Sequence, residues 1–470
     1  MKAMRRNMRL VVAIVMCLFV GFFAYFTYSV YFYGGRWFNN PYNPRLSTQK
    51  QAVRQGTVMD RDGEPLAFTD SQGNRRYARD DATRRAVSHV IGDNAGNVSN
   101  GAETFHAQYL LGFKTSIIER LAQVFQGGQR RGDDIHLTLS AKLNTYISRN
   151  FPSGSSGAVV IMNYRTGDIY AMVSKPDFDP NRVEAAKGEE GGSSLLNRAT
   201  QGLYPPGSTF KIITQAAAIN NLPDARSRPY FCDGALEVEF SVVTEAGNNI
   251  HGGITLQEAF AKSCNVTYSQ LALELGYDRM NTEAAAFGLG DNFLFRDLVV
   301  YNSEYPTDAR SADDLAWSGL GQGRVLVTPL HMAMTAACVA NGGVMMEPRL
   351  LMQVTGPQGQ RRMLGGPKAY RTALSPESAR LLRADMIAAV ARGSTGSGAR
   401  ISGFTVGGKT GSAEAVDDKT IQPHAWFVGF VDDPAHPLAI AVLVERSGSG
   451  GQVAAPLARR FLQRAIDLGL

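Results

Sequence analysis

A serine and a lysine stand three residues apart in segment 206–211, which reads Pro-Gly-Ser-Thr-Phe-Lys. On the first turn of a helix, residues at i and i+3 lie on one face, about 5 to 6 Å apart at Cβ, so Lys211 can reach Ser208. A serine hydroxyl becomes a good nucleophile when a neighbouring base takes its proton, and a lysine amine can be that base if burial or another cation lowers its pKa. The pair therefore predicts acyl transfer through Ser208, with Lys211 as its base.

Two further motifs follow this pair along the chain. A Ser-x-x-Lys pattern carries little weight alone, because about one or two matches are expected by chance in a chain of this length. Residues 263–265 read Ser-Cys-Asn, and residues 409–412 read Lys-Thr-Gly-Ser at the end of a predicted strand. The three motifs lie far enough apart to come from different elements that face one cleft, where a second lysine would help to lower the pKa of Lys211.

Capping signals and apolar spacing predict the helices that carry these motifs. Residues 208–220 form a predicted helix, so Ser208 would lie at its N-terminus, where free backbone N–H groups favour an anionic oxygen. Residues 256–275 have helical spacing with a polar interruption at 263–265. Thr-Pro at 328–329 and Ser-Pro at 375–376 predict the starts of two more helices, because an N-cap hydroxyl followed by proline suits a first turn.

Apolar runs of strand length predict a sheet around the helices. Residues 158–162 and 169–173 are apolar and are separated by Arg-Thr-Gly-Asp at 165–168, which is the pattern of a hairpin. Three late runs are also of strand length: 404–409, 425–431 and 438–445. We expect these runs to return to the sheet that begins near Gly157.

The N-terminal region predicts a membrane anchor. Residues 10–33 contain no charged side chain over 24 positions, and at about 1.5 Å per residue this helix exceeds the roughly 30 Å hydrocarbon layer. The alternative is a cleaved signal peptide, but its apolar region usually spans about 7 to 15 residues, and tyrosines stand where small residues would mark cleavage. Four cations precede the run and only Arg36 follows closely, which places tail 1–9 in the cytoplasm and all residues after about 34 outside it.

Composition excludes some functional classes. The chain has 470 residues, 44% of them hydrophobic, and a formal charge of +6. The length predicts two or three domains. Four of the positive charges precede the apolar run, so the remainder is nearly neutral, and we find no basic stripe with interleaved aromatics that would predict nucleic-acid binding. The four cations are Lys2, Arg5, Arg6 and Arg9.

Cysteine and histidine spacing predicts no metal site and no cofactor. The sequence contains no His-Glu-x-x-His or Cys-x-x-Cys pair. Cys232, Cys264 and Cys338 would face the oxidising side of the membrane. Cys232 and Cys264 could form a disulfide or remain small buried thiols, and the sequence leaves both alternatives open.

The ordered motifs resemble the penicillin-interacting serine transferases, whose signature is Ser-x-x-Lys, Ser-x-Asn and Lys-Thr-Gly. Further stretches are similar to the class B penicillin-binding proteins, the monofunctional peptidoglycan D,D-transpeptidases, in their compact PbpA-like form. These stretches are Arg54 with 56–67, Gly-Ala-Glu at 101–103, and Gly-Gln-Gly at 321–323 followed by Val-Thr-Pro at 327–329.

The resemblance implies a fold of the α/β (α+β) class. A transpeptidase domain at 153–470, similar to serine β-lactamases, would have a central antiparallel sheet and a helical subdomain. A small β-rich pedestal at 34–152 and one transmembrane helix at 10–33 would precede it. The Asp-Gly pair at 62–63 predicts a hairpin turn within that pedestal.

The resemblance also implies a role for each matching residue. Ser208 attacks the penultimate D-alanine carbonyl of a stem peptide and expels the terminal D-alanine, while Lys211 takes the serine proton. Ser263 and Lys409 relay a proton to the leaving amine. Asn265 orients the substrate amide.

The last motif is implied to bind substrate. Thr410 and Ser412 would hold the terminal carboxylate, and Gly411 would let the substrate backbone approach the strand. The backbone N–H groups of Ser208 and Ser412 would form the oxyanion hole, in which the loss of one donor costs about 100- to 1000-fold in rate.

Partners and location also follow from the resemblance. The implied ligands are peptidoglycan stem peptides ending in D-Ala-D-Ala and β-lactams, and an amine of a neighbouring stem peptide takes the acyl group. Segment 34–152 is too short for a glycosyltransferase domain, so a SEDS-family glycosyltransferase of the FtsW or RodA type is the expected membrane partner. The protein would be single-pass in the cell membrane, with its catalytic domain outside the cytoplasm.

Three other functions share part of this pattern. Class D β-lactamases can share the Ser-Thr-Phe-Lys and Lys-Thr-Gly motifs, but they carry an aliphatic residue where Asn265 stands. A class A β-lactamase would need a Glu-x-x-Leu-Asn motif between the second and third motifs, where the sequence has none. A D,D-carboxypeptidase differs only in giving the acyl group to water, and a non-enzymatic penicillin receptor usually has several transmembrane helices.

Overall fold

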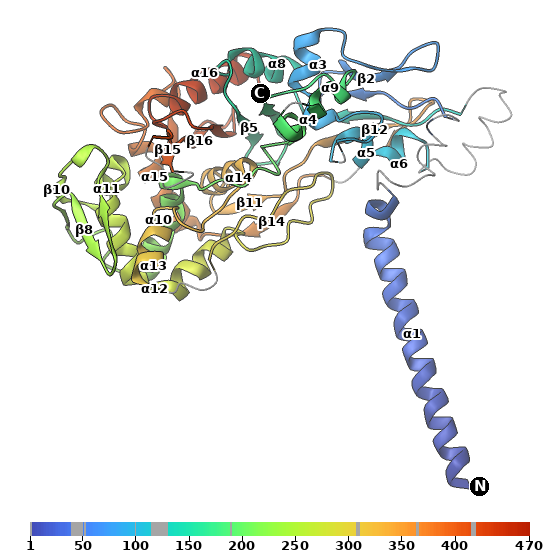
Figure 1. Cartoon of the computed structure of the whole chain (residues 1–470), viewed down its shortest axis with the longest axis horizontal. Coiled ribbons are helices and arrows are strands. Elements are labelled where there is room, and N and C mark those ends of the chain that lie inside the picture. The colour runs from blue at the N-terminus through green and yellow to red at the C-terminus, as the bar shows by residue number, and fades with distance from the viewer. Residues whose placement is uncertain are drawn as a thin grey trace.

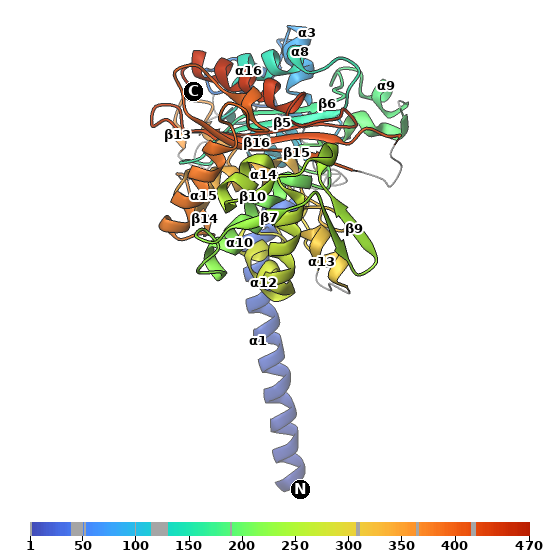
Figure 2. The same cartoon turned by 90° about the vertical axis from the view of Figure 1, so that its left-hand side faces the viewer.

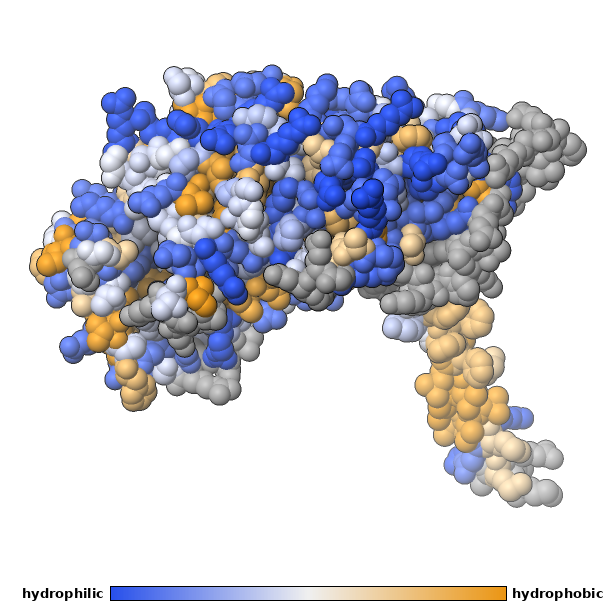
Figure 3. Space-filling model, turned by 45° about the horizontal axis from the view of Figure 1, so that its top comes forward, coloured by the Kyte–Doolittle hydropathy of each residue, from blue (hydrophilic) through white to orange (hydrophobic). Residues whose placement is uncertain are grey.

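The computed structural model describes residues 2–38, 50, 53–98, 100–113, 130–188, 190–306, 311–362, 366–414 and 420–470. One long helix, α1 (Lys2–Phe38), projects from a folded body that holds all the other described elements (Figure 1). Among the described residues, a single helical stretch, Arg6–Ser29 within α1, is long and apolar enough to cross a membrane, with a mean hydropathy of 2.5 and none of it buried. Apolar residues form most of the visible surface of this helix, with hydrophilic residues toward its free end (Figure 3).

A five-stranded antiparallel sheet forms the centre of the body. The first two strands form the predicted hairpin, and the three late strands return beside it as predicted. Their order across the sheet is β15 (Val406–Ala413), β16 (His424–Val431), β17 (Leu438–Val444), β5 (Gly157–Asn163) and β6 (Ile169–Lys175).

Helices cover both faces of this sheet, which explains why the central strands are apolar without alternation. Every residue of β5, β16 and β17 is buried. Helices α8 (Ala141–Asn150) and α16 (Ala454–Asp467) pack on one face and α14 (Pro329–Ala340) on the other (Figure 2).

The helices predicted at 256–275, after Thr328 and after Ser375 are all present. The 256–275 pattern is divided into α11 (Leu256–Lys262) and α12 (Asn265–Ala286) at Ser263, which has left-handed backbone angles. Helix α14 begins after Thr328 and α15 (Pro376–Ala388) after Ser375, and in each case the N-cap hydroxyl accepts a backbone N–H as predicted.

A second, six-stranded sheet lies on the N-terminal side, with two strands from beyond residue 350. Its order is β13 (Arg361–Arg362), β12 (Leu351–Thr355), β4 (Asp134–Leu137), β1 (Val58–Met59), β2 (Pro65–Thr69) and β3 (Arg75–Tyr77). The predicted turn at Asp62 and Gly63 joins β1 to β2. Because β12 pairs with β4, this sheet contains residues from both sides of the predicted boundary at 152 and 153, and that boundary stays a prediction.

A buried ion pair joins the stretches that resemble class B pedestals. The Arg75 guanidinium donates to Glu103 at 2.6 Å and to the backbone carbonyl of Gly56 at 2.8 Å. The side chains of Arg75 and Glu103 are 3% and 1% exposed, so neither charge could be removed without leaving the other buried and unpaired.

The other described elements are α10 (Lys211–Asn221), which carries Lys211, and a set of short helices and strands. The short elements are α3 (Asp81–Ala86), α4 (Ser88–Ile91), α5 (Ala102–Phe105), α6 (Ala107–Leu110), α9 (Val183–Gly188), η1 (Glu190–Leu195), η2 (Gly207–Phe210), β7 (Tyr230–Cys232), β8 (Ala235–Val238), β9 (Ser241–Thr244), η3 (Ala246–Asn248), β10 (Gly252–Ile254), α13 (Ala312–Ser318), β11 (Val344–Met346), β14 (Ala369–Thr372) and η4 (Ser397–Ala399).

Candidate active site

Ser208 lies in the 3₁₀ turn η2, which runs directly into α10. The turn is held from two sides. The N–H of Gly207 donates to the carbonyl of Gly321 at 2.9 Å, and the indole N–H of Trp426 donates to the carbonyl of Pro205 at 3.1 Å. These two hydrogen bonds fix the turn that carries Ser208. Ser208 itself is half-buried.

Lys211 connects this turn to the second motif. Its Nζ donates to the carbonyl of Ser263 at 2.7 Å and to Oδ1 of Asn265 at 2.7 Å, and the Ser263 Oγ lies 3.4 Å away. The lysine side chain is fully buried at the first residue of α10. These bonds fix the amine against the second motif, and Lys211 itself follows Ser208 by three residues.

The Ser263 hydroxyl lies between two buried lysines. Lys409 Nζ, which comes from β15, donates to Ser263 Oγ at 2.7 Å. Ser263 takes left-handed angles (φ 61°, ψ 38°) between α11 and α12, and this conformation turns both its carbonyl and its hydroxyl toward the amines. The structure thus brings together Lys211, Ser263, Asn265 and Lys409 as the sequence predicted.

Burial changes the acid–base properties of both amines. It lowers the pKa of Lys211 to about 8, although the negative charge of Glu245 acts in the opposite direction. Burial, reinforced by the positive charge of Lys211, lowers the pKa of Lys409 well below its usual value. Two amines that can be neutral near physiological pH can accept and return protons around Ser263.

The third motif packs directly on the nucleophile turn. A Cβ placed on Gly411 would lie 2.9 Å from the carbonyl oxygen of Pro206 and 3.1 Å from Cγ2 of Thr209. Glycine at this position therefore allows β15 to pack closely against η2. The family resemblance implied a different reason for this glycine, namely room for the substrate backbone beside the strand. Next to it, Thr410 is buried and Ser412 is exposed, with its Oγ accepting the N–H of Gly450 at 3.2 Å.

Sequence reasoning missed the residues that hold the chain before Ser208. Trp426, which no sequence motif indicates, is fully buried and donates its indole N–H to the carbonyl of Pro205. Glu445 accepts both the Tyr204 hydroxyl and the Arg198 guanidinium at 2.7 Å. These contacts join segments far apart in the chain, and no local pattern in the sequence indicates them.

A second set of polar contacts lies behind Lys211. The Tyr268 ring centroid is 5.3 Å from Lys211 Nζ, and its hydroxyl donates to Gln215 Oε1. Gln215 Nε2 donates to Asp385 at 2.7 Å, and Asp385 also accepts from Arg226. This chain of contacts fixes the helix on which Lys211 stands.

The serine turn, the shared serine hydroxyl and the antiparallel sheet together define a serine acyl-transferase of the penicillin-interacting class. The family described as "Penicillin binding protein transpeptidase domain" matches residues 157–463. The chain belongs to this family, which confirms the resemblance and the fold class inferred from the motifs.

Individual relatives cover almost the whole chain. The chain is 32% identical to Peptidoglycan D,D-transpeptidase PbpA of Mycolicibacterium smegmatis, over 99% of this chain and 100% of that protein. It is 31% identical to the PbpA of Mycobacterium tuberculosis strain H37Rv, over 91% of this chain and 92% of that one. Among solved structures, the ceftriaxone acyl-enzyme complex of M. tuberculosis penicillin-binding protein A matches with a TM-score of 0.81 and 30% identity, covering 89% of this chain and 99% of that one.

Proposed function

We propose that this protein is a peptidoglycan D,D-transpeptidase that is acylated on Ser208. The observation that carries the proposal is the position of the Ser263 hydroxyl, 2.7 Å from Lys409 Nζ and 3.4 Å from the Nζ of Lys211, which follows Ser208 by three residues. Relatives named as D,D-transpeptidases along nearly the full chain support it.

In the acylation step, Lys211 takes the proton of Ser208 as its oxygen attacks the penultimate D-alanine carbonyl. The N–H groups of Ser208 and Ser412 stabilise the oxyanion, as donors placed in advance do in acyl transfer. A proton passes through Ser263, which Lys409 contacts, to the leaving amine, and the terminal D-alanine departs. The half-buried position of Ser208 leaves the acyl-enzyme open to an acceptor.

Substrate binding is assigned to the second and third motifs. Thr410 and Ser412 hold the terminal carboxylate. Asn265 uses Oδ1 to hold Lys211 and one N–H to hold the carbonyl of Thr244, so its remaining N–H is the group that orients the substrate amide. In the second half-reaction, the amine of a neighbouring stem peptide attacks the acyl-enzyme and forms the crosslink.

We assign the protein to the cell membrane as a single-pass protein with a cytoplasmic N-terminus. The length and composition of Arg6–Ser29 support this topology, together with the cations that precede it. A SEDS-family glycosyltransferase is the proposed partner, through α1 and the pedestal at 34–152, on family analogy.

The test uses the purified full chain with a stem pentapeptide ending in D-Ala-D-Ala and a D-amino acid as acceptor. The expected products are released D-alanine and a pentapeptide that carries the acceptor at its end. Release of D-alanine with only tetrapeptide product would support a D,D-carboxypeptidase and contradict the proposal. Repeated turnover of a chromogenic cephalosporin, in place of one equivalent per chain, would support a β-lactamase.

A further inference from the structure

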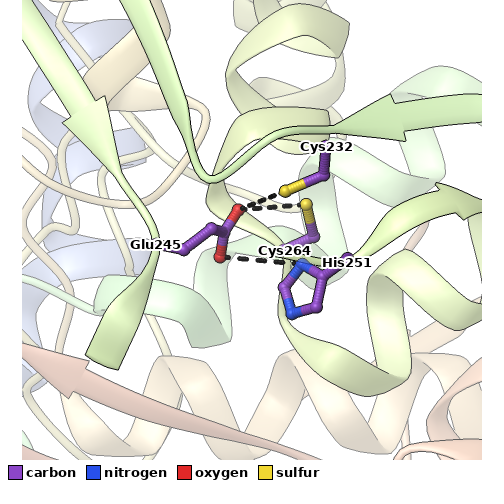
Figure 4. A group of neighbouring side chains, drawn as sticks. All are labelled: Cys232, Glu245, His251 and Cys264. Atoms are coloured by element: carbon purple, nitrogen blue, oxygen red, sulfur yellow. Dashed lines mark hydrogen bonds and ion pairs between the residues drawn. The ribbon is translucent and has the colours of Figure 1, made fainter. Parts of the chain in front are cut away.

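Four potential metal ligands meet beside the second motif. Cys232 lies at the end of β7, Glu245 directly after β9, His251 directly before β10, and Cys264 between Ser263 and α12 (Figure 4). One ligand atom from each of the four side chains lies within 4.8 Å of the others. The sequence predicted no metal site because these residues come from four separate segments and match no short-spaced motif.

The four side chains point to a common centre. Glu245 Oε1 lies 3.0 Å from the Cys264 sulfur and 3.5 Å from the Cys232 sulfur, and Oε2 lies 4.0 Å from His251 Nδ1. Both cysteines are fully buried thiols. The Nδ1 atom of His251 is buried without a hydrogen-bond partner, so a strong ligand atom faces the centre of the group unused.

We propose that Cys232, Glu245, His251 and Cys264 bind one Zn²⁺ ion as a tetrahedral structural site. Thiolate sulfur, imidazole nitrogen and carboxylate oxygen are the three ligand types that zinc takes, and four protein ligands without an open position are typical of structural sites. Thiolates disfavour magnesium and calcium, which prefer oxygen ligands. Bonds of about 2.0 to 2.3 Å at tetrahedral angles place ligand atoms roughly 3.3 to 3.8 Å apart, so the side chains need only a small contraction.

Zinc binding would leave the net charge of this group of side chains unchanged. Binding displaces one proton from each thiol, so two thiolates, one carboxylate and Zn²⁺ carry a net charge of −1, the same as Glu245 with two neutral thiols. The ion therefore adds no net charge beside the buried amines of Lys211 and Lys409. Zinc binding would therefore move the four side chains without changing the net charge that the two amines face.

The position of Cys264 gives the site a consequence for catalysis. Cys264 separates Ser263 from Asn265, the two residues that hold Lys211. A zinc ion would fix this turn to β7 and to the segments on either side of η3. The ion would thus position the catalytic turn and take no part in the reaction.

Metal content of the purified full chain tests the site directly, whatever reaction the protein catalyses. The chain is purified with a phosphine reductant and without chelator, and zinc is measured by mass spectrometry. We expect one zinc per chain in the wild type and in Cys338→Ser, a buried cysteine outside the group. Cys232→Ser and His251→Gln should lower zinc affinity at least about 10- to 100-fold, the loss seen for residues that only support a metal ligand.

Cobalt provides a second readout on the same protein. Zinc-stripped, reduced wild type should take up one Co²⁺ and develop thiolate-to-cobalt absorbance, and Cys232→Ser should show a weaker band. Reduced wild type that holds neither zinc nor cobalt would overturn the proposal. Equal metal content in wild type, Cys232→Ser and His251→Gln would overturn it as well.

The positioning role has its own measurement. Stripping zinc, or the Cys232→Ser substitution, should slow acylation by a fluorescent penicillin about tenfold or more, since displacements near 1 Å can cost about 100-fold. Readdition of zinc should restore the stripped wild type but not Cys232→Ser. Unchanged acylation after complete zinc removal would contradict the positioning role, while loss of acylation in every sample, including Cys338→Ser, would contradict the proposed function.

Discussion

At the scale of single residues, the site depends on two buried lysines that share one serine hydroxyl. The sequence predicted that the second and third motifs would face one cleft with Lys211, and Ser263, Asn265 and Lys409 do meet there. The acylation of Ser208 stays a prediction. The sequence also predicted that burial or a second cation would lower the pKa of Lys211. The structure shows that burial is the cause and that Glu245, which no motif indicates, opposes it.

The lowered pKa of Lys211 predicts how acylation depends on pH. A general base must be neutral, so the rate of acylation by a fluorescent penicillin should rise as pH increases through about 8 and then level off. Lys211→Ala should lower this rate about 100- to 10,000-fold, the usual contribution of general acid–base catalysis. The measurement is the acylation rate from pH 6 to 10.

Lys262→Ala is the matched control because Lys262 is exposed on α11, one residue before Ser263. It should keep both the wild-type rate and the wild-type pH midpoint. A rate that falls as pH rises through 8 in the wild type would contradict the role assigned to Lys211.

At the scale of elements, the central sheet was predictable and the N-terminal sheet was not. Apolar runs of strand length indicate strands such as β5 and β17 because both of their faces are buried. The five-residue strand β12 is half-exposed at three positions and exists because β4 lies beside it. The break between α11 and α12 was visible as a polar interruption. The left-handed conformation of Ser263, the C-cap of α11, was not, because glycine is the residue that usually marks this conformation in a sequence.

The contact between β15 and η2 predicts the effect of Gly411→Ala. The new Cβ would meet the carbonyl of Pro206 at 2.9 Å and push the strand from the nucleophile turn. We expect acylation by penicillin to fall about 100-fold, as for a displacement near 1 Å. Gly366→Ala, where no atom lies within 4 Å of the added carbon, should leave the rate unchanged. Normal acylation of Gly411→Ala would show that the close packing is not required.

The fully buried Asp385 of α15 ties this helix to α10 and α11. It accepts from Gln215 at 2.7 Å, from Arg226 at 2.6 Å and from Gln257 at 3.0 Å. Asp385→Ala should lower the free energy of unfolding by about 3 to 5 kcal/mol, because it leaves buried polar partners without an acceptor.

An exposed ion pair on the same helix gives the control for Asp385. Glu377→Ala removes a partner of Arg380, and both side chains are 65% exposed. This change should alter the free energy of unfolding by at most about 1 kcal/mol. Equal losses for the two variants in denaturant titrations would contradict the role of the buried carboxylate.

At the scale of the whole molecule, one apolar helix stands apart from a nearly neutral body (Figures 1 and 3). Hydropathy is a property of local sequence, so a helix apolar enough to cross a membrane could be predicted without a fold. The sheet that joins residues near 60 to residues near 351 could not, because that pairing depends on the complete tertiary structure.

The proposed anchor at 10–33 predicts how the protein behaves in membranes. The full chain should stay in the membrane pellet after alkaline carbonate extraction, and a chain that begins at residue 40 should be released. Intact mass of the membrane-bound protein should include the N-terminal residues. A mature protein cleaved near residue 34 would contradict the anchor and support a signal peptide.

The central claim is that Ser208 forms the acyl-enzyme, and peptide mapping after reaction with benzylpenicillin tests it most directly. We predict one penicilloyl group per chain, located on Ser208, no adduct in Ser208→Ala, and full labelling of Ser227→Ala, which removes an exposed serine outside the site. Equal labelling of wild type and Ser208→Ala, or an adduct on any other residue, would contradict the account.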